Sequence, residues 1–182
     1  IKIMKKKKNR RVIDANKCAR TESLRINAYN DALWIQDEDK IQRKTKDVKI
    51  VAKTKPTNRQ MKNLVLAFNV CKYVKSNAIV LAHKDSTVGI GSGQPSRLDS
   101  CQIAINKMKK FVNPTNDIVA ASDAFFPFVD GIEQLIQSGI SAVIQPAGSI
   151  RDQEIMKFAN QTGTALVLTI RQILRCRSPL PV

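Results

Sequence analysis

From Asn77 to Thr169 short apolar runs alternate with segments of helical periodicity, and this rhythm constrains the fold more than any other feature. The apolar runs have the length of buried strands, and the segments between them are long enough for helices. Such alternation favours a layered α/β fold, with helices on both sides of a sheet. The expected strands are residues 78–82, 87–90, 117–121, 141–145 and 165–169, and the expected helices are 99–111, 131–138 and 152–161.

The segment before Asn77 is more polar, and its strand signals are weaker. Residues 49–53 alternate polar and apolar side chains, and 12–14 and 33–35 are short candidates. After Pro56, Thr57 and Gln60 have the spacing of a capping box that begins a helix. Its inward stripe is expected to be Met61, Leu64, Val65, Phe68 and Cys71. We divide the chain into a basic segment (1–56), an α/β part (57–175) and an irregular tail (176–182).

The formal net charge of +16 is concentrated near the start, where residues 1–55 hold 17 basic and 7 acidic side chains. A charge run of this kind is usually a solvated face or tail. A basic nucleic-acid-binding module remains an alternative, but the aromatic residues cluster in an acidic stretch rather than among basic ones. We see no membrane-length apolar run, no leader pattern in residues 1–13 and no closely spaced cysteines, which favours a reduced, cytoplasmic setting.

Two segments near the middle carry residues that a core alone does not require. Asn77 stands where a helix ends and a buried strand begins, and its carboxamide could bind a ligand or satisfy backbone groups there. The stretch 89–97 contains three glycines and ends in Arg97. Glycines let backbone approach a ligand, and Arg97 could grip a phosphate through two hydrogen bonds. A plain turn is an equally good interpretation of the glycines.

A third segment, residues 121–130, places three phenylalanines within four positions between Asp123 and Asp130. Strand alternation and helical spacing both fail to explain Phe-Phe-Pro-Phe. Aromatic surface beside a carboxylate suits a flat heterocycle. A loop pinned by buried aromatic side chains is the alternative.

The stretches VKSNAIVLA, TVGIGSGQPSRLDS, ASDAFFPF and VIQPAGSIRD occur here in order, and KKKNRRVID, ALWIQDED and KIVAKTKPT precede them. From about residue 7 to about residue 175 the sequence resembles the AICAR transformylase domain of the bifunctional enzymes that also carry IMP cyclohydrolase activity. The resemblance implies a cytidine-deaminase-like α/β architecture without the deaminase zinc. It also implies formyl transfer from 10-formyltetrahydrofolate to AICAR in purine biosynthesis, with no metal. His83, expected in an exposed turn, matches no catalytic residue of the family.

The resemblance also assigns roles to individual residues. Asn77 matches a catalytic asparagine that orients the reacting groups, and Arg97 matches a ligand of the nucleotide phosphate. Phe125 and Arg171 match further AICAR-binding positions. The positions that match the folate pocket are Leu98, Pro127, Phe128, Asp130 and Ser149. We expect residues 91–97 and 125–130, with Asn77 and Ser149, to meet at one edge of the sheet.

The family's catalytic Lys-His pair lies in a preceding half-domain that this sequence does not contain. The alternative function is therefore a non-catalytic fragment that keeps the fold and a ligand pocket. Family members place the transformylase site at a homodimer interface. We accordingly expect this chain to leave apolar surface uncovered and to associate with a second copy or with the missing half.

Overall fold

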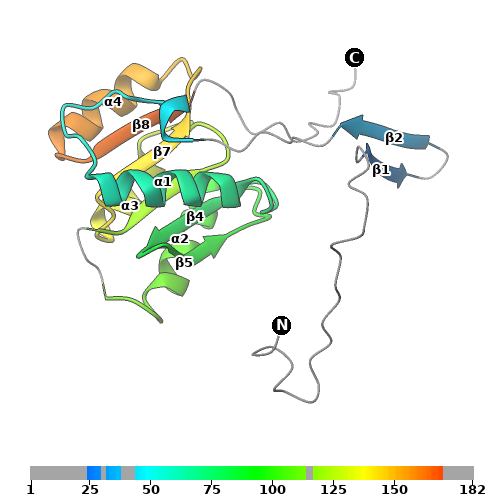
Figure 1. Ribbon diagram of the computed structural model, residues 1–182, viewed down its shortest axis with the longest axis horizontal. Helices are drawn as coiled ribbons and strands as arrows, with labels where there is room; N and C mark the ends of the chain where they lie inside the picture. The colour runs from blue at the N-terminus through cyan, green and yellow to red at the C-terminus, as the bar shows by residue number, and fades with distance from the viewer. Residues whose placement is uncertain (1–23, 30–31, 38–43, 114–116, 170–182) are drawn as a thin grey trace. The chain divides into compact units, whose positions relative to one another are not determined.

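The computed structural model describes residues 24–29, 32–37, 44–113 and 117–169 (Figure 1). The chain separates into two compact units, Ile1–Lys40 and Ile41–Val182. The strand expected at 12–14 and the basic run at residues 5–8 lie outside the described residues. The division at residue 57 made from the sequence stays a prediction.

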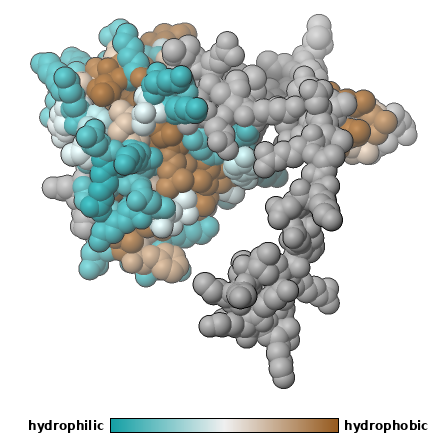
Figure 2. Space-filling model, in the orientation of Figure 1, coloured by the Kyte–Doolittle hydropathy of each residue, from teal (hydrophilic) through white to brown (hydrophobic). Residues whose placement is uncertain are grey.

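The described part of the first unit is a two-stranded antiparallel hairpin of β1 (Leu24–Tyr29) and β2 (Ala32–Asp37). Its register pairs Ile26 with Ile35 and Ala28 with Leu33, which puts these four residues on one face because strand side chains alternate. Ile26, Ile35 and Leu33, the three large side chains among them, are 60%, 59% and 69% exposed. The hairpin is accordingly partly brown, the colour of hydrophobic residues, in Figure 2. The predicted strand at 33–35 lies within β2.

The second unit is built around a six-stranded mixed sheet with the strand order β3-β8-β7-β6-β4-β5. Strands β6, β7 and β8 are parallel, whereas β4 is antiparallel to both of its neighbours and β3 is antiparallel to β8. The strands are β3 (Val48–Ile50), β4 (Ile79–His83), β5 (Ser86–Gly91), β6 (Val119–Ser122), β7 (Ala142–Pro146) and β8 (Ala165–Thr169). The helices are the 3-10 turn η2 (Thr45–Asp47), α1 (Asn58–Cys71), α2 (Arg97–Met108), α3 (Asp130–Gln137) and α4 (Asp152–Gln161).

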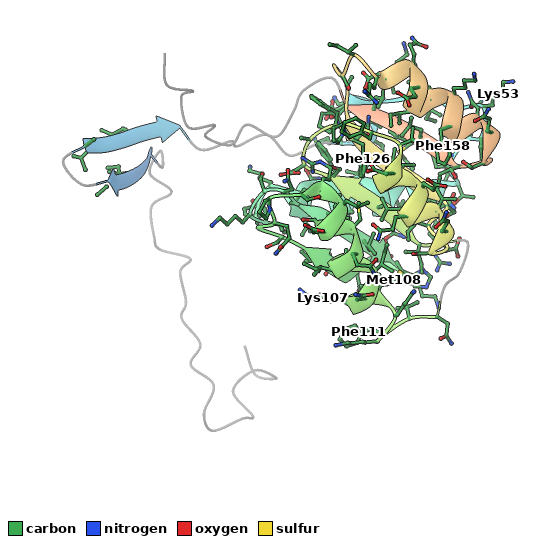
Figure 3. The ribbon with its side chains drawn as sticks, turned by 180° about the vertical axis from the view of Figure 1, so that it is seen from behind. Lys53, Lys107, Met108, Phe111, Phe126 and Phe158 are labelled. Carbon is green, nitrogen blue, oxygen red and sulfur yellow. The ribbon has the colours of Figure 1, made fainter. Side chains whose placement is uncertain are left out.

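Helices cover both faces of this sheet, which confirms the layered α/β fold. Helix α1 lies on one face, where its buried side chains pack against alternate residues of the strands. Helices α2, α3 and α4 cover the opposite face and enclose the larger core cluster (Figures 1 and 3). One helix covers the first face less completely than three cover the second. Apolar surface is correspondingly visible beside α1 in Figure 2.

Helix α1 begins with the predicted capping box. The Thr57 hydroxyl accepts a hydrogen bond from the Gln60 backbone N–H at 3.2 Å, and the Gln60 carboxamide oxygen accepts from the Thr57 N–H at 2.7 Å. These bonds satisfy two N–H groups that a helix start leaves without intrahelical partners. Of the predicted inward stripe, Leu64, Phe68 and Cys71 are buried, whereas Met61 and Val65 are half-buried.

Two glycines let helix α2 lie directly on the backbone of strand β5. A Cβ atom at Gly91 would stand 1.8 Å from the Ser100 carbonyl oxygen, and one at Gly89 would stand 2.2 Å from that of Ala104. Only glycine permits so close an approach of helix to strand. The ligand-approach interpretation of these two glycines is therefore replaced by a packing role.

The expected exposed turn at His83 is wrong. His83 is the last residue of β4 and is 8% exposed. The turn is shorter than expected because Lys84 and Asp85 both adopt positive φ angles, 49° and 59°, as a two-residue hairpin turn requires. The Asn63 carboxamide oxygen accepts a hydrogen bond from the Asp85 N–H at 2.9 Å and supports this conformation.

The helix expected over 99–111 predicts that Phe111 faces inward together with Ile103, Ala104 and Met108, and for Phe111 this is wrong. Helix α2 ends at Met108, so the helical period that would bury Phe111 does not reach it. Phe111 is 78% exposed beyond the helix end (Figure 3), while Ala104 and Met108 are fully buried as expected. Within the described residues no helix is both long and apolar enough to cross a bilayer.

Candidate functional site

A pocket of about 370 Å³ lies at one edge of the sheet, where β4 begins and β5 and β6 end. The antiparallel register, which pairs Ile79 with both Gly91 and Ser122, brings these strand ends together. In α/β folds ligands usually bind where loops leave the strand ends. The lining residues are Asn77, Pro95, Ser96, Arg97, Leu98, Phe126, Pro127, Phe128, Asp130 and Gly131.

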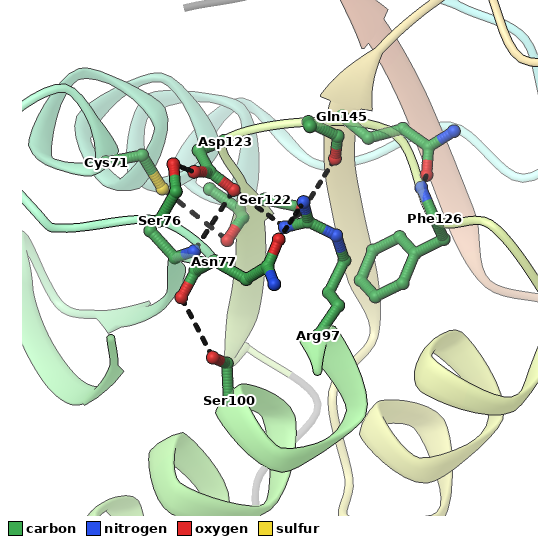
Figure 4. A network of polar contacts seen from close by, with 12 residues as sticks. Cys71, Ser76, Asn77, Arg97, Ser100, Ser122, Asp123, Phe126 and Gln145 are labelled. Atoms are coloured by element: carbon green, nitrogen blue, oxygen red, sulfur yellow. Dashed lines mark hydrogen bonds and ion pairs between the residues drawn. The ribbon is translucent and has the colours of Figure 1, made fainter. Parts of the chain in front are cut away.

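The carboxamide of Asn77 is held by three hydrogen bonds. Its Nδ2 group donates to the carbonyl oxygens of Gln94 at 2.9 Å and Pro95 at 2.8 Å. Its Oδ1 atom accepts from Arg97 Nη2 at 2.9 Å (Figure 4). Its backbone carbonyl accepts from the Ser100 hydroxyl at 2.8 Å. Both amide protons are therefore used inside the protein, and the remaining hydrogen-bonding capacity of this side chain is an acceptor lone pair on Oδ1.

Arg97, the first residue of α2, is paired with a carboxylate behind the pocket. Its Nη1 atom lies 2.6 Å from Asp123 Oδ1 and 2.9 Å from the Ser122 hydroxyl. The side chains of Arg97 and Asp123 are only 10% and 4% exposed. Three of the five N–H donors of the guanidinium are thus engaged within the protein, and a ligand would have to bind the others.

The aromatic segment divides between core and pocket. Phe126 is buried, and its N–H donates to the Gln145 carboxamide oxygen at 3.3 Å. Phe128 is 50% exposed, and the Arg151 guanidinium lies over its ring at 4.3 Å from the centroid. Both interpretations of Phe-Phe-Pro-Phe therefore apply, to different residues: one phenylalanine pins the loop, and another presents its ring at the pocket.

Helix α3 packs tightly against the buried Phe126. A Cβ atom at Gly131 would lie 2.7 Å from the Phe126 ring and 3.8 Å from Cys101 Sγ. Burial raises the pKa of the Cys101 thiol to about 12, an effect that Arg97 opposes and Asp130 reinforces. Since the thiolate is the reactive form, this cysteine is a packing residue rather than a nucleophile.

The structure brings together most of the residues predicted for the site. Six of them line the pocket: Asn77, Arg97, Leu98, Pro127, Phe128 and Asp130. Phe125 is half-buried and Ser149 is half-buried in the turn before α4, and neither is among the lining residues. Arg171 lies outside the described residues.

Sequence reasoning did not single out Asp123 as a centre of this site. The sequence did contain an indication, because Asp123 directly follows Val119–Ser122, a run of small and apolar residues that forms a fully buried strand. A carboxylate at such a position needs charged or hydrogen-bonding partners. Identifying Arg97 as the partner required the fold.

Two other hollows have less suitable chemistry. One of about 480 Å³ is bordered by Val51, Lys53 and α4, and one of about 370 Å³ lies at the opposite ends of β7 and β8. Each combines surface side chains and loop backbone without a buried charged group. In the described segments no cluster of three or more His, Cys, Asp or Glu side chains is arranged to hold a metal ion.

The model of the AICARFT/IMPCHase bienzyme family matches residues 1–107. The chain belongs to this family. It is 42% identical over 172 residues to the bifunctional purine biosynthesis protein PurH of Rhodospirillum rubrum, a match that covers 90% of this chain and 33% of that protein. It is 41% identical over 169 residues to PurH of Neisseria meningitidis serogroup C, covering 93% and 32%. The chain thus spans about a third of the length of these AICARFT/IMPCHase relatives.

Among solved structures, RibD of Acinetobacter baumannii overlaps with a TM-score of 0.39 at 12% sequence identity, over 61% of this chain and 34% of that one. This overlap is too small to support a conclusion about fold. The membership of the AICARFT/IMPCHase family therefore rests on sequence, and a cytidine-deaminase-like architecture stays a prediction.

Proposed function

We propose that this chain forms the part of an AICAR transformylase that positions AICAR and 10-formyltetrahydrofolate for formyl transfer in purine biosynthesis. The pocket that joins Asn77, Arg97 and the 127–130 segment carries this proposal. Asn77 and Arg97 form a polar wall of this pocket, and Leu98, Pro127 and Phe128 form an apolar wall. The two walls meet at one sheet edge, as a site for a polar nucleotide and a flat heterocycle requires.

The apolar wall suits the ring system of the folate. Leu98 and Phe128 keep 38% and 50% of their surface exposed, and Pro127, which also lines the pocket, is exposed. Large apolar side chains held at a pocket rather than in the core can bind a planar ligand by stacking. The Arg151 guanidinium covers Phe128 and fixes its ring.

On the polar wall Asn77 would meet the reacting amine of AICAR. In the transfer the amine nitrogen attacks the formyl carbon and the bond from that carbon to the folate nitrogen breaks. The amine loses a proton to a base, and the departing folate nitrogen takes up a proton. Because the free capacity of Asn77 is an acceptor on Oδ1, it would receive one N–H of the amine and orient the nitrogen lone pair. In this proposal the side chain of Asn77 serves as a hydrogen-bond acceptor.

The base that the reaction needs is proposed to come from the Lys-His pair of the family, outside this chain. We also propose that a second copy or the remaining part of the longer enzyme covers the apolar surface beside α1 and on the hairpin face. A homodimer and a cytoplasmic location stay predictions from the resemblance. A fragment that binds without turnover remains the second candidate. Among the lining side chains the potential base is the Asp130 carboxylate, and one of its oxygens already accepts from the Gly131 N–H at 2.7 Å.

Titration calorimetry of the 182-residue chain with AICAR and with a folate analogue tests the proposal, combined with a formyl-transfer assay. We expect weak binding of both ligands and transfer slower by about 10²–10⁴-fold than with a supplied Lys-His half, the usual contribution of a general base. The variant Phe128→Ala should weaken folate binding by about 1–2 kcal/mol through lost stacking.

Phe111→Ala provides the matched control, because Phe111 is a more exposed phenylalanine that does not line the pocket. It should leave both affinities unchanged. Absence of binding for both ligands would reject the proposed function. Full turnover by the chain alone would instead refute the assignment of the base to another part of the enzyme.

A further inference from the structure

Asp123 is a carboxylate buried behind the pocket, 5% exposed, and it does not line the pocket itself. Each of its oxygens has a partner: Oδ2 accepts from the Ser76 hydroxyl, and Oδ1 accepts from the Ala78 N–H at 3.1 Å and from Arg97 at 2.6 Å (Figure 4). Burial of a charge is costly unless it is paired and hydrogen-bonded. This carboxylate therefore determines where the guanidinium of Arg97 can rest.

The same chain contains an exposed pair for comparison. Arg59 and Asp117 lie 3.7 Å apart with side chains 49% and 45% exposed, and such a pair contributes little to stability because water screens both charges. In the Arg97–Asp123 pair both groups are withdrawn from water. Removing the carboxylate would leave Arg97 as an unpaired buried cation, which would move toward solvent.

Arg97 in turn sets the orientation of the Asn77 carboxamide. Its Nη2 donates to Oδ1 at 2.9 Å, while the two backbone carbonyls of Gln94 and Pro95 take the Nδ2 protons. A carboxamide flipped by 180° would point its NH₂ group at the guanidinium and its oxygen at the carbonyls. Arg97 and the two carbonyls therefore disfavour the flipped state together, and Arg97 is the one of these three partners that acts on the oxygen.

We propose that Asp123 is a positioning residue that acts through Arg97 to keep the Asn77 carboxamide oxygen as the acceptor presented to a ligand amine. The ligand side of this inference rests on the proposed function, whereas the orientation of Asn77 does not. A purely structural role for Asp123 would instead consist of anchoring the start of β4 through Ser76 and Ala78.

Solvent exchange of the Asn77 Nδ2 protons, followed by NMR in the ligand-free 182-residue chain, separates the two roles. The resonance is assigned by its loss in Asn77→Ala. Asp123→Asn keeps the size and one acceptor oxygen but removes the charge. We expect exchange faster by about tenfold or more, the effect of losing one charge-assisted hydrogen bond, because Arg97 leaves Oδ1.

Two controls accompany this variant. Asp117→Asn removes the carboxylate of the exposed pair and should not change the exchange at Asn77. Ser76→Ala removes the Oδ2 contact but leaves the charge, and should change it less than about twofold. Unchanged exchange in Asp123→Asn, or an equal increase in Ser76→Ala, would overturn the proposal in favour of the anchoring role.

Arg97→Lys keeps the charge beside Asp123 but lacks the second guanidinium nitrogen that reaches Asn77. It should release the carboxamide as Asp123→Asn does. If Asp123→Asn does not fold, Arg97→Lys still allows the proposal to be refuted, because unchanged exchange would show that nothing acts on Asn77 through Arg97. In AICAR titrations Asp123→Asn should raise the Kd about tenfold, with little further rise when Arg97 is already lysine. If the parent chain binds neither AICAR nor the folate analogue, the proposed function fails, while the exchange data still decide the role of Asp123.

Discussion

Replacing Gly91 with alanine should destabilise the larger unit strongly, because helix α2 rests on the backbone of strand β5. The new Cβ would lie 1.8 Å from the Ser100 carbonyl oxygen and 2.6 Å from its carbonyl carbon, whereas ordinary contacts begin at 3.4 Å. The helix would have to move locally by about 1.6 Å in an interior packed at crystal density. Both opposing atoms are backbone, so no side-chain rotation relieves the contact.

We expect the free energy of unfolding to fall by about 3 kcal/mol, the upper part of the usual range for overpacking. Urea unfolding of the 182-residue chain, followed by far-UV circular dichroism, measures this loss. The movement should also displace Arg97 at the start of α2 and so weaken AICAR binding. A loss of stability in the ligand-free chain is what a packing role requires, because a glycine that only let a ligand approach would lose affinity without losing stability.

Gly163→Ala is the control for backbone strain. Gly163 has a φ of 69°, but a Cβ there would meet no heavy atom within 4 Å. Its loss should therefore be about 1–2 kcal/mol, the cost of a left-handed conformation for an L-residue. If Gly91→Ala costs no more than Gly163→Ala, the reasoning from helix packing is refuted.

Two further predictions concern single side chains. Cys101 should resist iodoacetamide at pH 8 in the folded chain, measured by peptide mass spectrometry, because burial raises its pKa from 9.0 to about 12; rapid labelling would contradict this. As the pH rises above 9 the unfolded chain loses this proton first, so stability should fall with pH, and Cys101→Ala should reduce that alkaline slope. Asp85→Gly should raise the unfolding free energy by about 0.5–1 kcal/mol, since glycine accepts the φ of 59° without strain; a melting temperature that does not rise would argue against strain in this turn.

The elements of the larger unit were mostly predictable from local pattern. The α4 helix and the β8 strand have the expected bounds, and the capping box of α1 forms as expected. These features depend on residues within a few positions of one another, which the sequence displays directly. The errors at His83 and Phe111 occurred at element ends, where one residue of turn length decides between core and solvent.

Motif composition identified the segments of the candidate site but not the contacts within them. Glycine spacing in the 89–97 stretch suggested ligand approach, whereas the structure assigns Gly89 and Gly91 to the α2 contact. Sequence alone cannot separate the two because both need the same absence of a side chain. The aromatic segment showed the same ambiguity until burial separated Phe126 from Phe128.

By itself, then, the sequence determined the α/β layering, the order of the elements and the segments that hold the pocket residues, since periodicity, caps and composition are local properties. Only the tertiary structure decided that Asp123 is the centre of the polar network. Its partners Arg97, Ala78 and Ser76 are separated from it by 26, 45 and 47 positions along the chain. Hydrogen bonds act over about 3 Å. The antiparallel pairing of β4 with β6 brings Ser76 and Ala78 within that reach of Asp123, and the packing of helix α2 on the sheet brings Arg97 there.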